Sequence, residues 1–456
     1  MAAKKLTYFR MAGFGMGAVG FNLFYSGLNL YLLFYYTDVV GMRPAIAGLI
    51  FMLPVLWDAI TDPIMGGIAS RTRTRFGSFR PYILLGAPVM SLCFVFMFAA
   101  PLLFPGAIVA ACAISHIMFR TAFTVVAIPH GSLLAVMTYD SKERSRLAGF
   151  RTLFGLAGGL LTAAITLELA RYYGGEDLKL GFLYMAITFA IASTLIMALV
   201  FLVTFENPLP HGTRRRPTVA QSWKFLSRNT PFWILFTGIL AASVGNSIGT
   251  KTMVYYVSYN AGAPGSVSLV LTLGLLAAGL AVPFWTFMFS HIKKRTVWLL
   301  GTGGFFINSL ILYVLAPTDV STLIGFRLVD GVCLSAVIVA FWAMTPDTVE
   351  YGEWKSGDRD EGILFGINEF ALKAATGIGV GVLGFALGAI GYSAQGEQSA
   401  TALEGIKALA FLFPMLAYAF SFTCLYFYPI DLTLHQRLMA AIAFRNRSHQ
   451  AKTTGA

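Results

Sequence analysis

Two aspartates, Asp58 and Asp62, lie inside a long apolar stretch and are the residues best suited to chemistry in this chain. Four residues apart, they share one face of a helix, where a charge in hydrocarbon costs at least ~2.5 to 3.5 kcal/mol. Two stacked carboxyls suit Na⁺ or a proton, because hard cations prefer oxygen ligands and desolvation favours a protonated carboxyl. The pattern predicts a coupling-cation site; the alternative is a helix-packing salt bridge.

Composition puts this acid pair in a membrane protein. Hydrophobic residues make up 57% of the chain and charged residues 12%, with a mean hydropathy of +0.71, whereas a soluble domain is about 25% charged. The net charge of +12 does not indicate a nucleic-acid partner, because the basic residues form short clusters between apolar runs. All four cysteines lie in apolar runs and predict no disulfide framework.

Twelve apolar segments are long enough to cross a bilayer, which takes about 20 helical residues. Most of the 33 lysines and arginines fall on one side of this plan, so both termini are expected on the inner side. The expected spans cover residues 11–36, 45–69, 81–101, 106–136, 148–170, 180–204, 231–258, 265–290, 296–316, 320–345, 361–391 and 402–428.

The longest connection is hydrophilic and basic and divides the spans into six and six. We predict an all-α membrane protein made of two six-helix bundles, with a linker and a tail in the cytoplasm. The bundles cover 1–205 and 231–430, the linker 206–230 and the tail 431–456. This plan resembles the major facilitator superfamily, whose halves are repeats related by an axis along the membrane normal.

Several motifs narrow the resemblance to one branch. Residues 58–63 (Asp-Ala-Ile-Thr-Asp-Pro), followed by 75–81 (Arg-Phe-Gly-Ser-Phe-Arg-Pro), are similar to the signature of the glycoside-pentoside-hexuronide:cation symporter family, the melibiose-permease-like carriers. Residues 346–353 (Pro-Asp-Thr-Val-Glu-Tyr-Gly-Glu) resemble that family's tenth loop. Residues 36–41 and 128–144 add matches in the same order. The resemblance covers most of the chain.

The resemblance implies roles for four residues. Acids at the positions of Asp58 and Asp62 coordinate Na⁺, Li⁺ or H⁺ in that family, and the hydroxyl at the position of Thr124 completes the site. The lysine at the position of Lys373 pairs with the acids. An unpaired ammonium in the apolar surroundings of Lys373 would be costly, which agrees with a pair. Apart from Na⁺ or H⁺ as coupling ion, no cofactor is expected.

The sugar-binding positions depart from the family pattern. Asn22 and Ala127 stand where melibiose-type carriers have acids for galactoside hydroxyls, and Gly131 stands where an aromatic ring stacks on the sugar. Arg151 keeps the position of an arginine that helps to hold the sugar. The resemblance therefore implies a small-molecule substrate but not galactoside binding.

Embedded cations replace the lost acids. Arg120, His130 and Lys251 lie within spans four and seven, and Glu369 lies one helical turn before Lys373. A more positive cavity suits an anionic substrate such as a hexuronide, another carboxylate or a lipid-like head group. The alternative is that Arg120 and Lys251 pair with Glu369 or Asp330 across the bundle.

Loops with charges of both signs suggest a gate. Arg144, Asp347, Glu350 and Arg359 would form inter-domain salt bridges that break during the inward transition. The alternative is a solvated charge run that only sets topology.

Together these features predict a secondary active transporter in a bacterial inner membrane, surrounded by lipid and acting as a monomer. We expect Na⁺- or H⁺-coupled symport of a sugar-like substrate, a glycoside or hexuronide, by alternating access; the alternative cargo is an anionic amphipath such as a lysolipid. A membrane-embedded enzyme is disfavoured. The sequence has no Gly-rich phosphate loop, no metal-spaced cluster of His and Cys and no nucleophile elbow.

Overall fold

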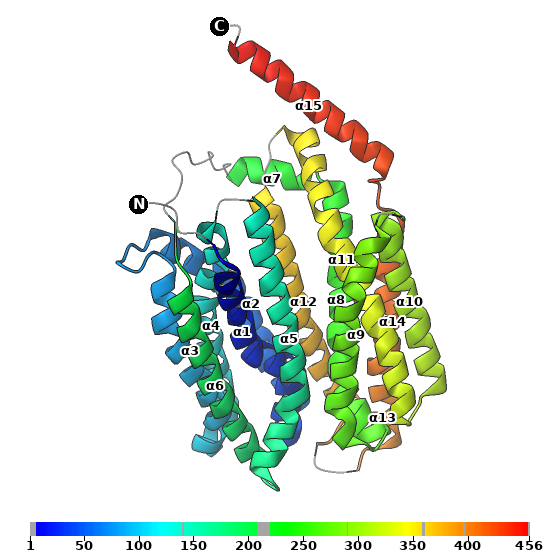
Figure 1. Ribbon diagram of the computed structural model, residues 1–456. Helices are drawn as coiled ribbons and strands as arrows, with labels where there is room; N and C mark the ends of the chain where they lie inside the picture. The colour runs from blue at the N-terminus through cyan, green and yellow to red at the C-terminus, as the bar shows by residue number, and fades with distance from the viewer. Residues whose placement is uncertain are drawn as a thin grey trace. The chain divides into compact units, whose positions relative to one another are not determined.

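The computed structural model describes residues 6–138, 141–207, 219–289, 291–357, 361–394 and 397–454. Side chains are left out at positions 59, 70, 135, 141–142, 144–145, 219–222, 361–362, 432, 443 and 446–454. The described chain is almost wholly helical, and twelve of its segments are long and apolar enough to span a membrane (Figure 1). The expected all-α membrane fold is confirmed.

The first six spans are single long helices, the first of which ends in a wider π-helical turn. They are α1 (Tyr8–Phe34) with η1 (Tyr35–Val39), α2 (Pro44–Arg71), α3 (Arg80–Leu103), α4 (Ile108–Met137) after η2 (Pro105–Ala107), α5 (Ser141–Gly174) and α6 (Leu178–Val203). Glu206 closes the start of α3: its carboxylate accepts from the backbone N–H groups of Ser78, Phe79 and Arg80 at 2.8, 2.8 and 3.1 Å. A carboxylate stabilises a helix start because the first N–H groups have no partner within the helix.

The other six spans follow a short helix, α7 (Val219–Ser227). They are α8 (Thr230–Tyr255) with η3 (Tyr256–Asn260), α9 (Val267–Met288) after η4 (Pro264–Ser266), α10 (Lys294–Leu315), α11 (Val320–Ser356), α12 (Glu361–Ala389), and α13 (Ala400–Lys407) with η5 (Ala408–Leu412) and α14 (Phe413–Tyr426). A further helix, α15 (Leu432–Thr454), comes after the twelfth span.

The tenth span is longer than its expected end at residue 345, because α11 continues through Pro346 to Ser356. A proline removes one backbone donor from a helix. Side chains donate to carbonyls next to the gap: Thr345 Oγ1 to the carbonyl of Phe341 and Lys294 Nζ to that of Ala343, each at 2.9 Å. The helix then ends at Gly357, whose φ of 85° is the left-handed conformation that glycine adopts readily.

The first and seventh spans end in the same way. In η1 the N–H groups of Val40 and Met42 donate to the carbonyls of Tyr35 and Tyr36. In η3, at positions 221 residues later, Ala261 and Ala263 donate to Tyr256 and Val257. Gly41 and Gly262 follow with φ of 82° and 64°. This local repeat is what two related halves would produce.

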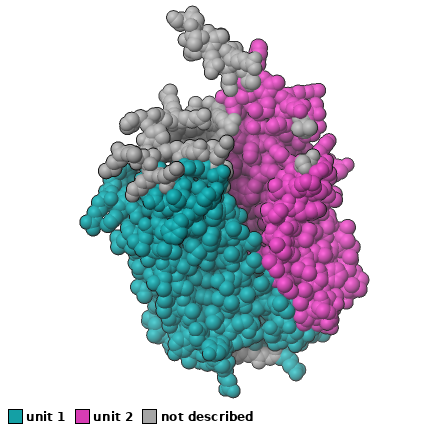
Figure 2. All heavy atoms as spheres, in the orientation of Figure 1, with its two compact units in different colours: residues 1–211, 250–272, 380–406 teal, residues 212–249, 273–379, 407–456 magenta. Residues whose placement is uncertain are grey.

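The chain forms two compact units (Figure 2). Unit 1 consists of residues Met1–His211, Thr250–Thr272 and Val380–Ile406. Within it α1 packs on α5 and α6, α3 on α4 and α6, and α2 on α4. Glycine lets α2 approach the end of α12, since a Cβ on Gly384 would lie 2.5 Å from the carbonyl of Pro44. The contact between α2 and α4 positions the acid pair.

Unit 2 consists of residues Gly212–Gly249, Leu273–Gly379 and Lys407–Ala456. In its apolar core α10 packs on α11 and α14. The buried rings of Phe305 and Tyr418 stack with centroids 4.0 Å apart, and Trp298 Nε1 donates to Ser421 Oγ at 3.2 Å. A second cluster joins α7 to α11 through Phe225 and Val349.

Candidate functional site

The two acids of α2 meet two polar residues of α4 in register. Arg120 Nη2 donates to Asp58 Oδ2 in an ion pair, and Thr124 Oγ1 donates to Asp62 Oδ1 at 2.7 Å. Asp62 follows Asp58 by four residues on α2, and Thr124 follows Arg120 by four residues on α4. The two contacts therefore lie on successive helical turns, about 6 Å apart along the helices. We call them the arginine rung (Asp58–Arg120) and the threonine rung (Asp62–Thr124).

Both rungs lie largely inside unit 1. Asp58 is 3% exposed, Arg120 5% and Thr124 2%, whereas Asp62 is only half-buried. The arginine rung is therefore a buried ion pair, in which the carboxylate stabilises a guanidinium that is largely shielded from water. The threonine rung combines a carboxylate and a hydroxyl, oxygen ligands of the kind that Na⁺ accepts.

Further hydrogen bonds lie near the rungs, two of them between α2 and α4. Trp57 Nε1 donates to Thr121 Oγ1 at 3.0 Å, and His116 Nδ1 lies 3.0 Å from the carbonyl oxygen of Ile50. The Thr61 hydroxyl donates to the carbonyl of Trp57 within α2, at 3.3 Å. Trp57 thus directly precedes Asp58 in the chain, and its indole is hydrogen-bonded to α4.

Four residues expected at the substrate are dispersed over unit 1. Asn22 is held within α1, where its amide donates to the carbonyl of Ala18 at 2.8 Å. His130 is 1% exposed and stacks on Phe14, with ring centroids 4.6 Å apart. Arg151 is exposed on α5.

Lys251, the fourth of these residues, lies on the part of α8 that belongs to unit 1 and is 6% exposed. Its ammonium lies over the ring of Phe51 on α2, 5.8 Å from the centroid. A cation over an aromatic face is stabilised by the ring quadrupole. Lys251 is therefore a buried cation that contacts α2, the helix of the two acids.

Unit 2 holds the charged residues of α12 and α11. Lys373 is half-buried on α12 and Glu369 is exposed one turn earlier. Asp330 on α11 is 6% exposed and accepts from Asn308 Nδ2 at 2.7 Å and from Arg327 Nη1 at 2.9 Å. The partners of Asp330 are thus on α10 and on its own helix.

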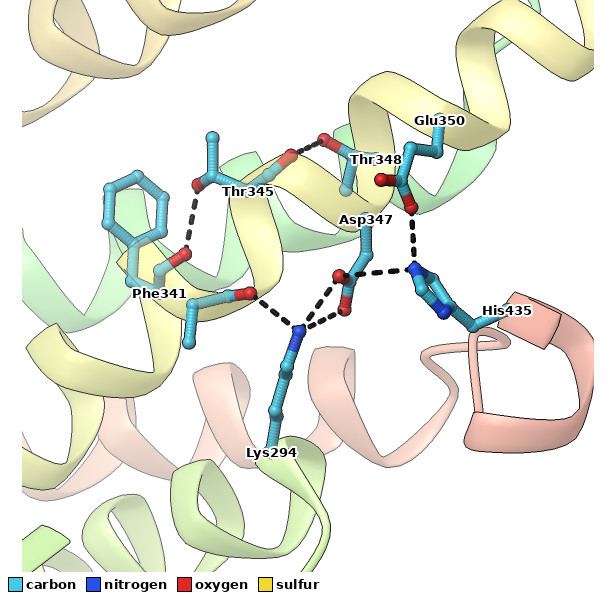
Figure 3. A network of polar contacts seen from close by, with 8 residues as sticks. Lys294, Phe341, Thr345, Asp347, Thr348, Glu350 and His435 are labelled. Carbon is cyan, nitrogen blue, oxygen red and sulfur yellow. Dashed lines mark hydrogen bonds and ion pairs between the residues drawn. The ribbon is translucent and has the colours of Figure 1, made fainter. Parts of the chain in front are cut away.

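Two of the expected gate residues belong to a charged cluster of unit 2. Lys294 Nζ donates to both carboxylate oxygens of Asp347, at 2.8 and 2.9 Å. His435 of α15 lies 2.5 Å from Glu350 and 3.8 Å from Asp347, and Figure 3 shows all four side chains converging beside α11. The side chain of Arg144 and the whole of Arg359 lie outside the described residues.

Unit 1 contains a further polar cluster, centred on Asp38. Its carboxylate accepts from Thr37 Oγ1 at 2.6 Å, from Tyr392 OH at 2.5 Å and from Tyr259 OH. Burial, reinforced by the Asp38 carboxylate, raises the pKa of the Tyr392 hydroxyl, which therefore stays protonated and donates. These hydroxyls connect the end of α1 with the segments that follow α8 and α12.

Two features of the site were not expected from the sequence. One is the pairing of Arg120 with Asp58: the spacing of four residues on both α2 and α4 is compatible with this pair but does not select it. The other is the role of Tyr259 and Tyr392 around Asp38, for which the separation of 221 and 354 residues leaves no local signal.

Known proteins resemble this chain over nearly its full length. A family model described as MFS/sugar transport protein matches residues 13–432. An isoprimeverose transporter of Lactiplantibacillus pentosus is 32% identical over 418 residues, which cover 90% of this chain and 86% of the relative. A glucuronide carrier protein homolog of Escherichia coli K12 is 27% identical over 456 residues, 98% of each.

The fold has solved counterparts. A bacterial homolog of the human lysosomal transporter Spinster, in an inward-facing and unoccupied conformation, superposes with a TM-score of 0.71 over 92% of this chain and 96% of that one. At 13% identity this likeness concerns the fold alone. The family match and the twelve spans agree: this chain belongs to the MFS sugar transport family and is a multi-pass transporter of the bacterial inner membrane, not an enzyme.

Proposed function

We propose that this transporter is a cation-coupled symporter of a glycoside or hexuronide and that the coupling cation binds at the acid pair of α2, with Asp62 and Thr124 as its ligands and Asp58 one helical turn away. The observation that carries the proposal is the threonine rung, a carboxylate and a hydroxyl in direct contact on two packed helices. A membrane protein retains such a site where an ion is bound and released, since embedded carboxylates are costly. Relatives named as a putative glycoside/cation symporter and as a glucuronide carrier protein homolog support the choice of cargo.

The proposed cycle is alternating access by two six-helix domains, residues 1–205 and 231–430, with both termini in the cytoplasm and residues 206–230 as linker. The cation neutralises Asp62 and so favours the conformation that binds substrate, because a ligand shifts an equilibrium by its differential affinity for the two states. Lys373 would pair with the acids when the cation has left. Asp347 and Glu350, with Arg144 and Arg359, would gate the inner side.

For the substrate we propose Asn22, His130, Arg151 and Lys251 of unit 1 as binding residues, together with Glu369 of α12. The burial of Lys251 favours an anionic substrate, because a buried ammonium makes strong charge-assisted hydrogen bonds to a carboxylate. A hexuronide has both sugar hydroxyls and a carboxylate. The second candidate is an anionic amphipath such as a lysolipid, which Lys251 would also attract.

A transport screen in proteoliposomes tests this proposal. Purified transporter is supplied with neutral glycosides, matched hexuronides and lysolipids, under an imposed Na⁺ gradient, an imposed H⁺ gradient or none. We expect saturable accumulation of a glycoside or hexuronide that needs one of the two gradients. Uptake of lysolipids alone would favour the second candidate, and equal uptake with and without gradients would exclude symport.

A further inference from the structure

The arginine rung is not required by the transport cycle proposed above. Its Asp58 and Arg120 are 3% and 5% exposed, so a permanent positive charge of the chain itself lies on one of the two acids expected to bind the coupling cation. A guanidinium does not deprotonate in proteins. The side chain of Arg120 therefore keeps its positive charge whatever ion is bound nearby.

We infer that Arg120 is a tethered cation at the Asp58 end of the coupling site and that it restricts the transporter to one small cation, held on the threonine rung. This inference rests on the proposed function, since it names which carboxylate of the same site is paired with an arginine of the chain itself. It makes Arg120 a residue that determines ion affinity and stoichiometry.

Electrostatics gives the reason. A Na⁺ ion that bound Asp58 would either share the carboxylate with the guanidinium or displace it. Sharing brings two positive charges within a few ångströms, where repulsion is stronger than in water because the protein has a lower effective dielectric constant. Displacement leaves a buried guanidinium without its carboxylate, which is strongly unfavourable. Both routes weaken cation binding at Asp58.

Helix register keeps the two rungs distinct. Arg120 and Thr124 lie one turn apart on α4, as Asp58 and Asp62 do on α2. When Arg120 faces Asp58, Thr124 therefore faces Asp62, and the hydrogen bond from Trp57 Nε1 to Thr121 Oγ1 is made in the same register. Exchanging the partners would require a turn of helix sliding past its neighbour.

A purely structural ion pair predicts a different outcome from a tethered cation. Removing a structural arginine lowers stability and leaves cation affinity unchanged. Removing a tethered cation instead takes a positive charge away from Asp58 and so strengthens its attraction for Na⁺. The affinity for Na⁺ is therefore the quantity to measure, with thermal stability recorded in parallel.

The experiment titrates Na⁺ and Li⁺ against full-length transporter in nanodiscs, following the unfolding temperature and the tryptophan fluorescence. Trp57 adjoins Asp58, and subtraction of a Trp57→Phe background isolates its signal from the other six of the seven tryptophans. Arg120→Gln removes the charge, and Arg120→Lys is the matched control that keeps it. Arg120→Ala with and without added guanidinium ion forms a second arm, in which the free ion replaces the lost group if Arg120→Gln does not fold.

We expect Arg120→Gln to lower the half-saturating Na⁺ concentration at least tenfold, and Arg120→Lys to stay within about threefold of the unchanged protein. In Arg120→Ala, millimolar guanidinium should reverse the gain in Na⁺ affinity. A folded Arg120→Gln protein with unchanged or weaker Na⁺ binding would overturn the inference. So would an Arg120→Ala protein whose Na⁺ affinity ignores guanidinium.

Parallel transport assays separate this inference from the proposed function. If the unchanged protein accumulates substrate with an ion gradient but Arg120→Gln gains no Na⁺ affinity, only the role of Arg120 is refuted. If no ion gradient drives accumulation by the unchanged protein, the proposed symport is refuted, whatever the variants bind.

Discussion

The two rungs between α2 and α4 hold chemically identical acids in different ways. Asp58 has a guanidinium partner and is almost fully buried, whereas Asp62 accepts from a hydroxyl and is half-buried. A buried ion pair is difficult to open because the guanidinium would lose its carboxylate. A hydroxyl next to a carboxylate can turn toward an arriving cation at little cost.

We expect the two acids to have different functions, although they look equivalent in the sequence. The arginine rung resembles the acid of α11, since Asp330 also has an arginine partner, Arg327. The threonine rung has instead the oxygen ligands of a cation site, a carboxylate and a hydroxyl. We therefore assign packing and charge balance mainly to Asp58, and reversible cation binding mainly to Asp62. The following predictions test that division, in order of decreasing effect.

The largest expected effect is on stability. Asp58→Asn leaves the Arg120 guanidinium buried without its carboxylate and should cost about 3 to 5 kcal/mol. Asp62→Asn keeps an oxygen acceptor for Thr124 and should cost about 1 to 2 kcal/mol. Equilibrium unfolding in mixed micelles measures both. Equal losses would remove the distinction between the rungs.

The next effect is on the coupling ion. Thr124→Val removes the hydroxyl on Asp62 and should raise the half-saturating concentration of the coupling ion roughly tenfold, since hydrogen bonds to charged groups contribute about 1.5 to 3 kcal/mol. Thr121→Val, which removes the acceptor of Trp57 Nε1 three residues away, is the matched control and should change it less than twofold. Ion-dependent uptake rates decide between them.

The sequence predicted the fold well but only part of this site. Apolar runs and charge asymmetry define twelve spans because a bilayer imposes their length, and the i, i+4 spacing put both acids on one face. The partner of each acid depends on how α2 is rotated against α4. That rotation follows from packing of residues 62 positions apart, which no local pattern encodes.

A smaller effect concerns the substrate. Lys251→Ala should raise the KM for a hexuronide about fivefold, equivalent to about 1 kcal/mol, and leave that for a matched neutral glycoside nearly unchanged. Lys355→Ala, which removes an exposed lysine beside Trp354, serves as control. An equal change in KM for both substrates would show that Lys251 does not distinguish the charged substrate from the neutral one.

The smallest expected effect is at the buried acid of unit 2. Asp330→Asn should lower stability, because it disturbs the contacts with Asn308 and Arg327, yet leave the dependence of uptake on the coupling ion within about twofold. The half-saturating ion concentration is the measurement. A tenfold change would mean that substitution of any buried carboxylate alters ion dependence. The difference between the two rungs would then not explain coupling.

The central claim, that Asp62 couples ion and substrate, is tested most directly by comparing two modes of transport in the same vesicles. Asp62→Asn should fail to accumulate substrate under an ion gradient and still exchange labelled for unlabelled substrate, because exchange needs substrate binding and alternating access but no driving ion. Accumulation at the level of the unchanged protein would contradict the account.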